Sequence, residues 1–376
     1  MDIFSRIEKP SLLLDVERAR ANIRQMARKA AAQNVSLRPH FKTHQSAVIG
    51  EWFAAEGVKA ITVSSVDMAR YFISYGWKDV TIAFPVNIRQ ITVMESLARQ
   101  AKLGLVVESV AGARALGDKI RSDVSIWLKV DVGSGRTGLL HDNSAAFMAV
   151  ITEVSRHSQL HLRGLLAHAG HTYRSADAPQ VITRYMESVT RLEGLRTALQ
   201  AMNSPELEIS VGDTPGCTLS PNLGRVAEIR PGNFVFYDVQ QLGVGACTPD
   251  QIAVALACPI VALHPQREIV VIYGGAIHLS KDTADWYGQR IYGLVALPNV
   301  NRQVGQPGWG DPLAEAYVAS LSQEHGLVHI PRKQMEQLQI GDLLCVLPVH
   351  SCLTAQAMGR YLTLDGERIL MMPLMS

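Results

Sequence analysis

The chain alternates between short apolar runs and amphipathic, helix-like segments from about residue 35 to about residue 230. Stretches such as Asn143–Arg156 and Gln180–Met202 separate the runs. The apolar runs are Val35–Leu37, Ala60–Val63, Val80–Ala83, Leu103–Val107, Val124–Val130, Leu162–Leu166, Leu207–Val211 and Val226–Ile229. Runs that are apolar throughout are typical of parallel strands covered on both faces. Eight such units predict a (β/α)8 barrel, with an open doubly wound sheet as the alternative.

A different pattern begins near residue 250, where the helix-like segments fade. The expected strands there are Ile252–Leu263, Glu268–Tyr273, Gly326–Ile330, Asp342–Val346 and Arg368–Met372. They predict a smaller β-rich domain, with a boundary near residues 243–251. We therefore expect a barrel over residues 9–247 and a β-rich domain over residues 248–376 together with residues 1–8.

Composition narrows the class of protein. The 376 residues carry a net charge of +2, which gives no basic field for nucleic acid. No apolar stretch is long enough to cross a bilayer, and the N-terminus lacks the features of a secretion signal. The five cysteines show no disulfide framework. These features predict a cytoplasmic enzyme with no nucleic-acid or membrane partner.

Polar residues gather directly after the expected strands. Lys42 follows the first strand, His168 and Tyr173 follow the sixth, and Gly212 follows the seventh. In a parallel barrel these loops open on one face, where barrel enzymes keep their active sites. Chance does not readily produce this clustering, so it predicts a functional site.

Lys42 lies in the run Arg38–His44, between His40 and His44. A lysine shielded from bulk water at the end of a strand can lose its proton near neutral pH and form a Schiff base with an aldehyde cofactor. The alternative is a solvated lysine that opens a helix.

Two later loops suggest a phosphate site. Gly212 offers a backbone amide and Thr214 a hydroxyl. Gly232 and Asn233 offer backbone amides, and Gly232 has no side chain. Barrels commonly hold phosphate with the loops after the seventh and eighth strands. The alternative is ordinary turn chemistry.

Three further side chains could surround a cofactor. Arg230 could face a pyridine nitrogen or pair with a carboxylate such as Glu228. Tyr173 could contact a cofactor ring or phosphate. His168 and His171 lie in a loop with glycine between them, so we expect hydrogen-bonding roles there instead of metal binding.

The run Gly133–Gly138 has the spacing of a dinucleotide-binding loop. No helix is expected at its third glycine, and no acidic residue closes a strand about 20 positions later. We therefore interpret it as a glycine-rich active-site loop that carries Arg136.

His350 and Cys352 follow the expected strand Leu343–Leu347. Residues two apart in an extended chain point the same way, so this pair could face one ion. Imidazole and thiolate are preferred ligands of zinc. Two protein ligands leave coordination positions open for water or substrate. The alternative is a packed histidine beside a buried free cysteine.

These motifs together resemble those of the D-serine dehydratase and D-threonine aldolase family of pyridoxal-phosphate enzymes, which have an alanine racemase-type barrel. The resemblance runs from Leu12–Asp15 to Pro348–Thr354. The matching motifs between them are Arg38–His44, His168–Tyr173, Arg230–Asn233 and Ser280–Asp282.

The resemblance implies that Lys42 forms the Schiff base with pyridoxal 5′-phosphate, and that Arg230–Asn233 binds its phosphate. It implies a divalent metal, zinc or alternatively manganese, on His350 and Cys352. The His-x-Cys pair is the form of the dehydratase branch. Asp213 departs from the family pattern and would place a negative charge near the phosphate unless it points away. Relatives are dimers, so we expect a homodimer.

The expected reaction converts a 3-hydroxy D-amino acid, such as D-serine or D-threo-3-hydroxyaspartate, to a 2-keto acid and ammonia. The alternative reaction is retro-aldol cleavage to glycine and an aldehyde. The chain could also be a racemase, or a non-catalytic protein that binds pyridoxal phosphate. The metal pair argues against both of these functions.

Overall fold

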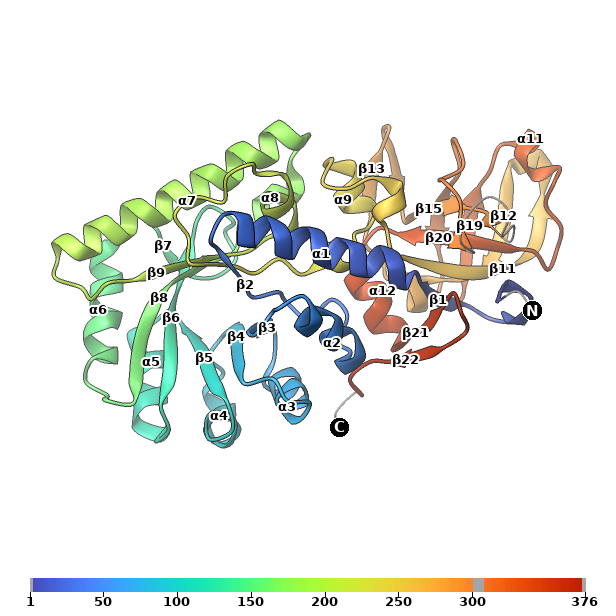
Figure 1. Cartoon of the computed structure of the whole chain (residues 1–376). Coiled ribbons are helices and arrows are strands. Elements are labelled where there is room, and N and C mark those ends of the chain that lie inside the picture. The colour runs from blue at the N-terminus through green and yellow to red at the C-terminus, as the bar shows by residue number, and fades with distance from the viewer. Residues whose placement is uncertain (1–2, 300–307, 374–376) are drawn as a thin grey trace. The chain divides into compact units, whose positions relative to one another are not determined.

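The computed structural model describes residues 3–299 and 308–373, which form two compact units. Residues 24–232 form the first, here called the barrel unit (Figure 1). The described parts of residues 1–23 and 233–373 form the second, here called the β-rich unit. The boundary between residues 23 and 24 falls within helix α1 (Val16–Ala32).

Eight parallel strands form the sheet of the barrel unit, in the spatial order β2, β10, β9, β8, β6, β5, β4, β3. Their bounds are β2 (Ser36–Leu37), β3 (Ile61–Val63), β4 (Asp79–Pro85), β5 (Lys102–Val107), β6 (Val124–Asp131), β8 (Leu160–Ala167), β9 (Glu208–Val211) and β10 (Glu228–Ile229). The ends of the sheet meet just past β2, where His40 bridges Thr62 of β3. The Phe41 N–H also donates to the Thr62 carbonyl at 2.9 Å. The sheet closes on itself, so the predicted (β/α)8 barrel is confirmed.

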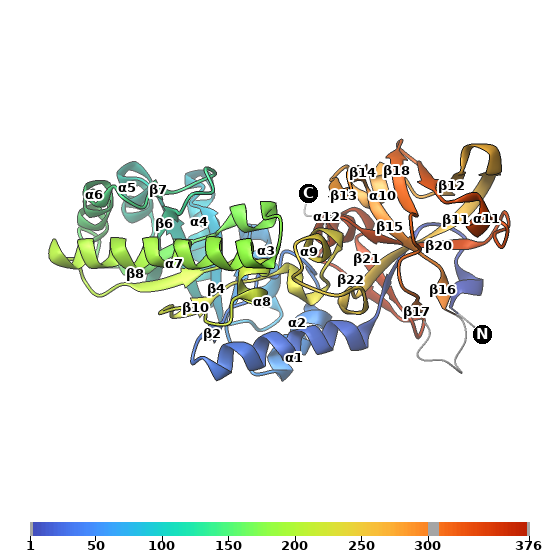
Figure 2. The ribbon, with the colours of Figure 1, turned by 90° about the horizontal axis from the view of Figure 1, so that it is seen from above.

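Helices follow the strands and lie outside them (Figure 2). They are α2 (Ala47–Ala55), α3 (Val66–Ser74), α4 (Ile91–Ala98), α5 (Val110–Lys119), α6 (Ser144–Val154), α7 (Ala178–Ala201) and α8 (Thr214–Leu219). Each of the eight predicted apolar runs coincides with a strand. Val106, Trp127 and Leu166, from three neighbouring strands, form a buried cluster. Burial on both faces explains why the runs are apolar throughout.

The β-rich unit contains six antiparallel strands that close into a small barrel in the order β11, β12, β19, β18, β15, β20. Their bounds are β11 (Val254–His264), β12 (Ile269–Tyr273), β15 (Gly293–Ala296), β18 (Tyr317–Leu321), β19 (His325–His329) and β20 (Leu343–Pro348). Strand β11 allows the closure, because its first half pairs with β20 and its second half with β12. Strands β1 (Ser11–Leu14), β21 (Arg360–Thr363) and β22 (Arg368–Leu370) extend the sheet from β11.

The prediction of a β-rich C-terminal part is confirmed, and all five strands expected there are present. The expected strands did not include β15 and β18, nor β1 and β21 of the same sheet. Helix α12 (Ser351–Met358) follows β20 directly. Among the described residues, no helix combines the length and the apolar character that crossing a bilayer requires.

Candidate functional site

Lys42 lies in a turn just past β2, at the C-terminal end of the barrel strands. Its backbone N–H donates to His40 Nδ1 at 3.4 Å, and its carbonyl accepts from Gln45 Nε2 at 3.1 Å. The residue is exposed, so the expected shielding of Lys42 by the protein is wrong for this structure. A turn at the rim of the barrel exposes the side chain to the space above the strands.

The residues beside Lys42 anchor this turn in the core. Phe41 is fully buried, and its ring lies 4.4 Å from that of His44 and 5.0 Å from that of Phe53. His44 Nδ1 accepts from the Ser46 N–H at 3.1 Å. Burial lowers the pKa of His44 to about 3, so its ring is neutral at physiological pH. His44 therefore supports the position of Lys42 and carries no charge of its own.

Several cations surround the space above the strands. Burial lowers the pKa of His168 well below its ordinary value, and Arg136, Lys42 and Lys129 lower it further. The pKa of His40 falls in the same way, through burial and then Lys42 and Arg230. These mutual effects show that the cations lie close together. The mouth of the barrel therefore favours an anionic ligand.

Lys129 also belongs to this cluster, although it was not among the site residues expected from the sequence. It lies in β6 and is 4% exposed. Burial, followed by the charges of Arg230 and Arg136, lowers its pKa to about 7. A single cation inside the apolar run Val124–Val130 was the available signal.

Arg230 is buried and donates through Nε to the Ser210 hydroxyl at 2.6 Å and through Nη2 to the Ala167 carbonyl. Burial lowers its pKa to about 10. The direct pair with Glu228 that we considered does not form. The Ser210 hydroxyl instead donates to Glu228 Oε1 at 2.8 Å, while Arg38 Nε lies 2.7 Å from Glu228 Oε2. Glu228 thus neutralises Arg38 directly and reaches Arg230 through Ser210.

The two glycines of the expected phosphate loops pack against backbone. A Cβ atom on Gly212 would lie 2.9 Å from the Arg230 carbonyl oxygen, and one on Gly232 would lie 2.8 Å from the His40 carbonyl oxygen. Any side chain at either position would push these segments apart. Both loops therefore require glycine for close approach.

Asp213 points away from the expected phosphate position. Its Oδ1 accepts from the Gly216 N–H at 2.6 Å and from the Thr172 hydroxyl at 2.8 Å, so it caps α8. Burial raises its pKa to about 6. Thr214 is buried, and its hydroxyl has no partner among the described residues. That hydroxyl is therefore a buried polar group with unused hydrogen-bonding capacity among the described residues.

His168 and Tyr173 lie on the loop after β8, with their rings 6.0 Å apart. His168 Nδ1 lies 2.6 Å from the Gly212 carbonyl oxygen, which makes Nδ1 the donor and leaves Nε2 as an acceptor. The Thr214 N–H donates to the Tyr173 hydroxyl at 3.0 Å. The loop after β8 is thus joined to the expected phosphate loop. His171 instead turns toward α7, where its Nε2 lies 3.5 Å from the Ser188 hydroxyl.

The glycine-rich loop after β6 is built around Asp131. Its Oδ1 accepts from the amides of Gly133 at 2.9 Å and Ser134 at 2.8 Å. Gly138 is followed by strand β7 (Leu139–Leu140), not by a helix. The loop therefore lacks the helix start that would hold a dinucleotide phosphate, and it presents Arg136 as an exposed residue.

His350 and Cys352 lie at the junction of β20 and α12 in the β-rich unit. The expectation of an extended chain through both residues is wrong. His350 has extended backbone angles at the N-cap, but Cys352 already belongs to the first turn of the helix. The two side chains still interact. Burial opposes the charged imidazole, but Cys352, Asp238 and Asp282 outweigh it and raise the pKa of His350 to about 10.

Asp282 fixes the orientation of His350. The Nδ1 atom of His350 lies 2.6 Å from Asp282 Oδ2, so Nε2 is the nitrogen left for a metal. Among the described residues, no group of three or more His, Cys, Asp or Glu side chains is placed to hold a metal. A metal held by His350 and Cys352 alone would keep coordination positions open for water or substrate.

The Asn233 side chain does not take part in the barrel unit. Its Nδ2 donates to Asp238 Oδ2 at 2.6 Å and to the Ser351 hydroxyl at 2.9 Å, and lies 3.7 Å from Cys352 Sγ. Asp238 Oδ2 also accepts from the Ser351 N–H at 3.0 Å. Asn233 and Asp238 thus hold the first turn of α12, which carries Cys352. Only the backbone of Asn233 could serve the expected phosphate loop.

In comparisons with known proteins, two families match successive parts of the chain. The family described as alanine racemase, N-terminal domain, matches residues 14–239, and a putative serine dehydratase domain matches residues 253–364. A D-threo-3-hydroxyaspartate dehydratase of Delftia sp. (strain HT23) is 26% identical over 97% of this chain and 96% of that protein. A D-serine dehydratase of Dictyostelium discoideum is 23% identical over 97% and 95%.

A solved structure has the same fold. It is a cysteine-to-alanine mutant of a D-threo-3-hydroxyaspartate dehydratase in the metal-free form. It matches with a TM-score of 0.89 at 24% identity, over 99% of both chains.

Proposed function

Because the chain belongs to the family of proteins with an alanine racemase N-terminal domain, we propose that it is a dehydratase that depends on pyridoxal phosphate and a divalent metal. The substrate class is a 3-hydroxy D-amino acid such as D-serine or D-threo-3-hydroxyaspartate, and the products are a 2-keto acid and ammonia. The observation that carries the proposal is the amine of Lys42 among cations at the barrel mouth, in a chain that also carries an oriented His–Cys pair. The similar dehydratases support it.

The barrel unit fits the cofactor. Lys42 would supply the amine for the aldehyde, and Arg230 would interact with the pyridine nitrogen. Gly212, Thr214, Gly232 and the backbone of Asn233 would hold the phosphate, because the glycines allow close approach and the Thr214 hydroxyl lacks a partner among the described residues. His168 and Tyr173 would contact the cofactor. On this proposal residues 9–247 bind the cofactor.

The bound cofactor supplies an electron sink for the bond broken at the substrate α-carbon. The residues of the chain move the protons. Lys42 Nζ would take the α-proton of the substrate, which requires the neutral amine. The cations Lys129, Arg136 and Arg230 attract the substrate carboxylate.

The β-rich unit fits a metal, and residues 248–376 with 1–8 would form the metal-carrying part. His350 Nε2 and Cys352 Sγ are the ligands, and Asp282 holds the imidazole by its other nitrogen. The soft thiolate and the imidazole favour zinc, with manganese as the alternative. The metal would supply Lewis acidity toward the 3-hydroxyl, a poor leaving group. Loss of the α-proton and the hydroxyl releases one water, and hydrolysis of the resulting enamine consumes one and releases ammonia.

The decisive experiment is an assay of the purified protein with D-serine, D-threonine and D-threo-3-hydroxyaspartate, with and without a chelator. Keto acid and ammonia that disappear with the chelator support the dehydratase. Glycine and an aldehyde indicate the aldolase. A yellow protein without turnover indicates a non-catalytic cofactor-binding protein.

A second experiment addresses Lys42 itself. Wild-type protein saturated with pyridoxal phosphate should show a visible chromophore, and borohydride should fix the cofactor on the peptide containing Lys42. The Lys42→Ala variant should show neither. Trapping at another lysine would contradict the assignment.

Oligomeric state and location complete the proposal. We expect a homodimer, which sedimentation equilibrium would test, and a cytoplasmic location. All five cysteines are free and buried, as a reducing compartment permits.

A further inference from the structure

A cavity of ≈ 880 Å³ opens at the N-terminal ends of the barrel strands. Its lining includes Asp79 and Lys102, the first residues of β4 and β5, and Glu208, the first residue of β9. Lys42 and the other cofactor residues proposed above lie past the opposite, C-terminal ends of the barrel strands. The cavity is therefore separate from the proposed cofactor site, and nothing in that function uses it.

Charged side chains dominate the lining. Its basic and acidic residues are His161, Lys102, Arg163, Arg196, Arg225, Asp79, Glu206 and Glu208. Two of the carboxylates are already paired: Arg38 Nη1 lies 2.6 Å from Asp79 Oδ1, and Arg163 Nε lies 3.0 Å from Glu208 Oε2.

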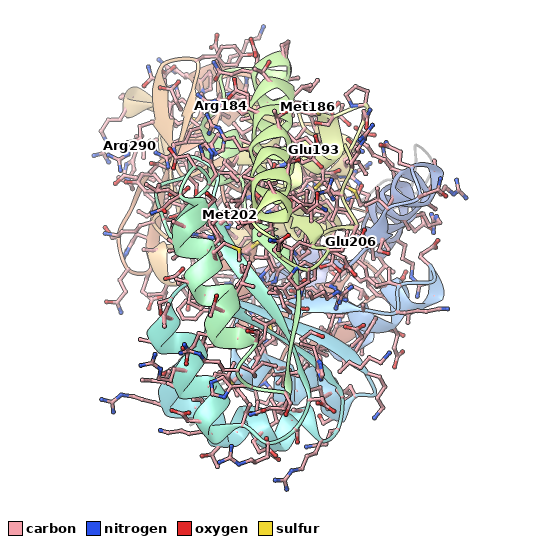
Figure 3. The ribbon with its side chains drawn as sticks, turned by 90° about the vertical axis from the view of Figure 1, so that its left-hand side faces the viewer. Arg184, Met186, Glu193, Met202, Glu206 and Arg290 are labelled. Atoms are coloured by element: carbon pink, nitrogen blue, oxygen red, sulfur yellow. The ribbon has the colours of Figure 1, made fainter. Side chains whose placement is uncertain are left out.

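The remaining cations exceed the remaining carboxylates. In the described part of the chain, Lys102, Arg196 and Arg225 form no ion pair. Glu206 is the one lining carboxylate without an arginine partner among those residues. Figure 3 labels Glu206 beyond Met202, at the opposite end of α7 from Arg184. The cavity thus carries surplus positive charge.

One cation is held in a fixed position. The guanidinium of Arg163 lies over the Trp127 ring, 4.9 Å from its centroid, and its side chain is 28% exposed. Its Nη2 lies 3.5 Å from Glu228 Oε2. Stacking and two carboxylates fix its orientation before any ligand arrives, which reduces the entropy lost on binding.

We propose that this cavity is a binding site for a small polyanion. Its volume lies in the range of small-molecule sites. Guanidinium groups match carboxylate and phosphate oxygens in two-point hydrogen bonds, and Arg196 and Arg225 have no competing ion pair in the described chain. Phosphates and polycarboxylates share this chemistry.

The test is isothermal titration calorimetry of the cofactor-saturated enzyme with pyrophosphate and, separately, with citrate. Saturation keeps the anions out of the proposed cofactor site. We expect at least one anion to bind with a Kd of about 1 mM or tighter. The double variant Arg196→Gln/Arg225→Gln should bind it at least about tenfold more weakly, because two charge-assisted contacts are lost.

A matched control removes the same charge elsewhere. Arg28 and Lys119 are exposed residues outside the cavity, so Arg28→Gln/Lys119→Gln should keep the wild-type affinity. Absence of binding by both anions overturns the proposal, and so does an equal loss in the control. If the double variant does not fold, the exposed Arg225→Gln change alone should weaken binding by about threefold. Full affinity in that variant also overturns the proposal.

Discussion

The Nδ1 atom of His350 lies 2.6 Å from the Oδ2 atom of Asp282, although the two residues are 68 positions apart in the chain. The bond leaves Nε2 as the nitrogen that would coordinate a metal, and it fixes the plane of the ring. The approach depends on the start of α12, where His350 is the N-cap residue. The metal proposal therefore needs Asp282 as well as the two ligands.

The Asp282→Asn variant should bind zinc about 10- to 100-fold more weakly than wild type, because the carboxylate no longer fixes the imidazole. Competition with a chromophoric chelator measures this affinity without any turnover. Asp311→Asn, a change at an exposed residue, is the control and should keep the wild-type affinity. Equal zinc affinity in Asp282→Asn and wild type would remove Asp282 from the site.

The barrel could be predicted from the sequence because each strand is buried on both faces and reads as a continuous apolar run. The same apolar pattern explains why Lys129 was not identified, since a lysine among Trp127, Leu128 and Val130 reads as part of the core. Its significance arises from Arg136 and Arg230, which other segments bring to it. Spatial neighbours of this kind follow from strand order, which periodicity does not encode.

The pairing of Glu228 shows the same limit. Arg38 is its partner because β10 lies beside β2, with Glu228 opposite Ser36 in the register. From sequence alone, Arg230, two positions along the chain, was the natural candidate. The reason given for pairing His350 with Cys352 was partly wrong, since the chain turns into a helix after His350. His350 is the N-cap residue and Cys352 lies in the first helical turn, where an extended strand was expected.

Lys129 should make stability rise with pH. Its pKa is about 7 in the folded protein and ordinarily 10.5, so between these values the unfolded chain binds a proton that the folded chain does not. The full cost of burial is present below about pH 7 and is lost as the pH rises toward 10. Lys129→Met should therefore be more stable than wild type at about pH 7, and this advantage should shrink by on the order of 2 kcal/mol by about pH 9.

Urea unfolding at the two pH values measures the change for Lys129→Met. The control is Lys119→Met, a change at an exposed lysine, whose difference from wild type should not vary with pH. The outcome that contradicts the prediction is a Lys129→Met difference that is the same at both values.

Asp213 should make stability fall as the pH rises, the opposite of the effect of Lys129. Burial raises its pKa from 3.8 to about 6, so the folded chain holds a proton between these values that the unfolded chain has lost. Its contribution to the free energy of unfolding is fully present below about pH 4 and is lost as the pH rises through 6. Asp213→Asn keeps an oxygen acceptor for Gly216 without a titratable charge. Relative to wild type, its free energy of unfolding should rise by about 2 kcal/mol between about pH 4 and pH 7.

Asp177 provides the control for Asp213. It caps α7 with the same geometry, its Oδ1 accepting from the Gln180 N–H at 2.8 Å, but it is exposed. Thermal unfolding across this pH range should show a gain for Asp213→Asn and a much smaller change for Asp177→Asn. Parallel curves for both variants would mean that burial of Asp213 does not control its protonation.

Glu228 should be the carboxylate on which the barrel unit depends most. It is 2% exposed and neutralises the buried Arg38, and Ser210 connects it to the buried Arg230. Glu228→Gln leaves the buried Arg230 without its countercharge and Arg38 with Asp79 alone, so urea unfolding should show a loss of about 3–5 kcal/mol. Glu208 contacts Arg163 at 3.0 Å, but its side chain is 45% exposed, so Glu208→Gln should cost less than about 1 kcal/mol. Similar losses in the two variants would show that the buried network contributes no more than a surface ion pair.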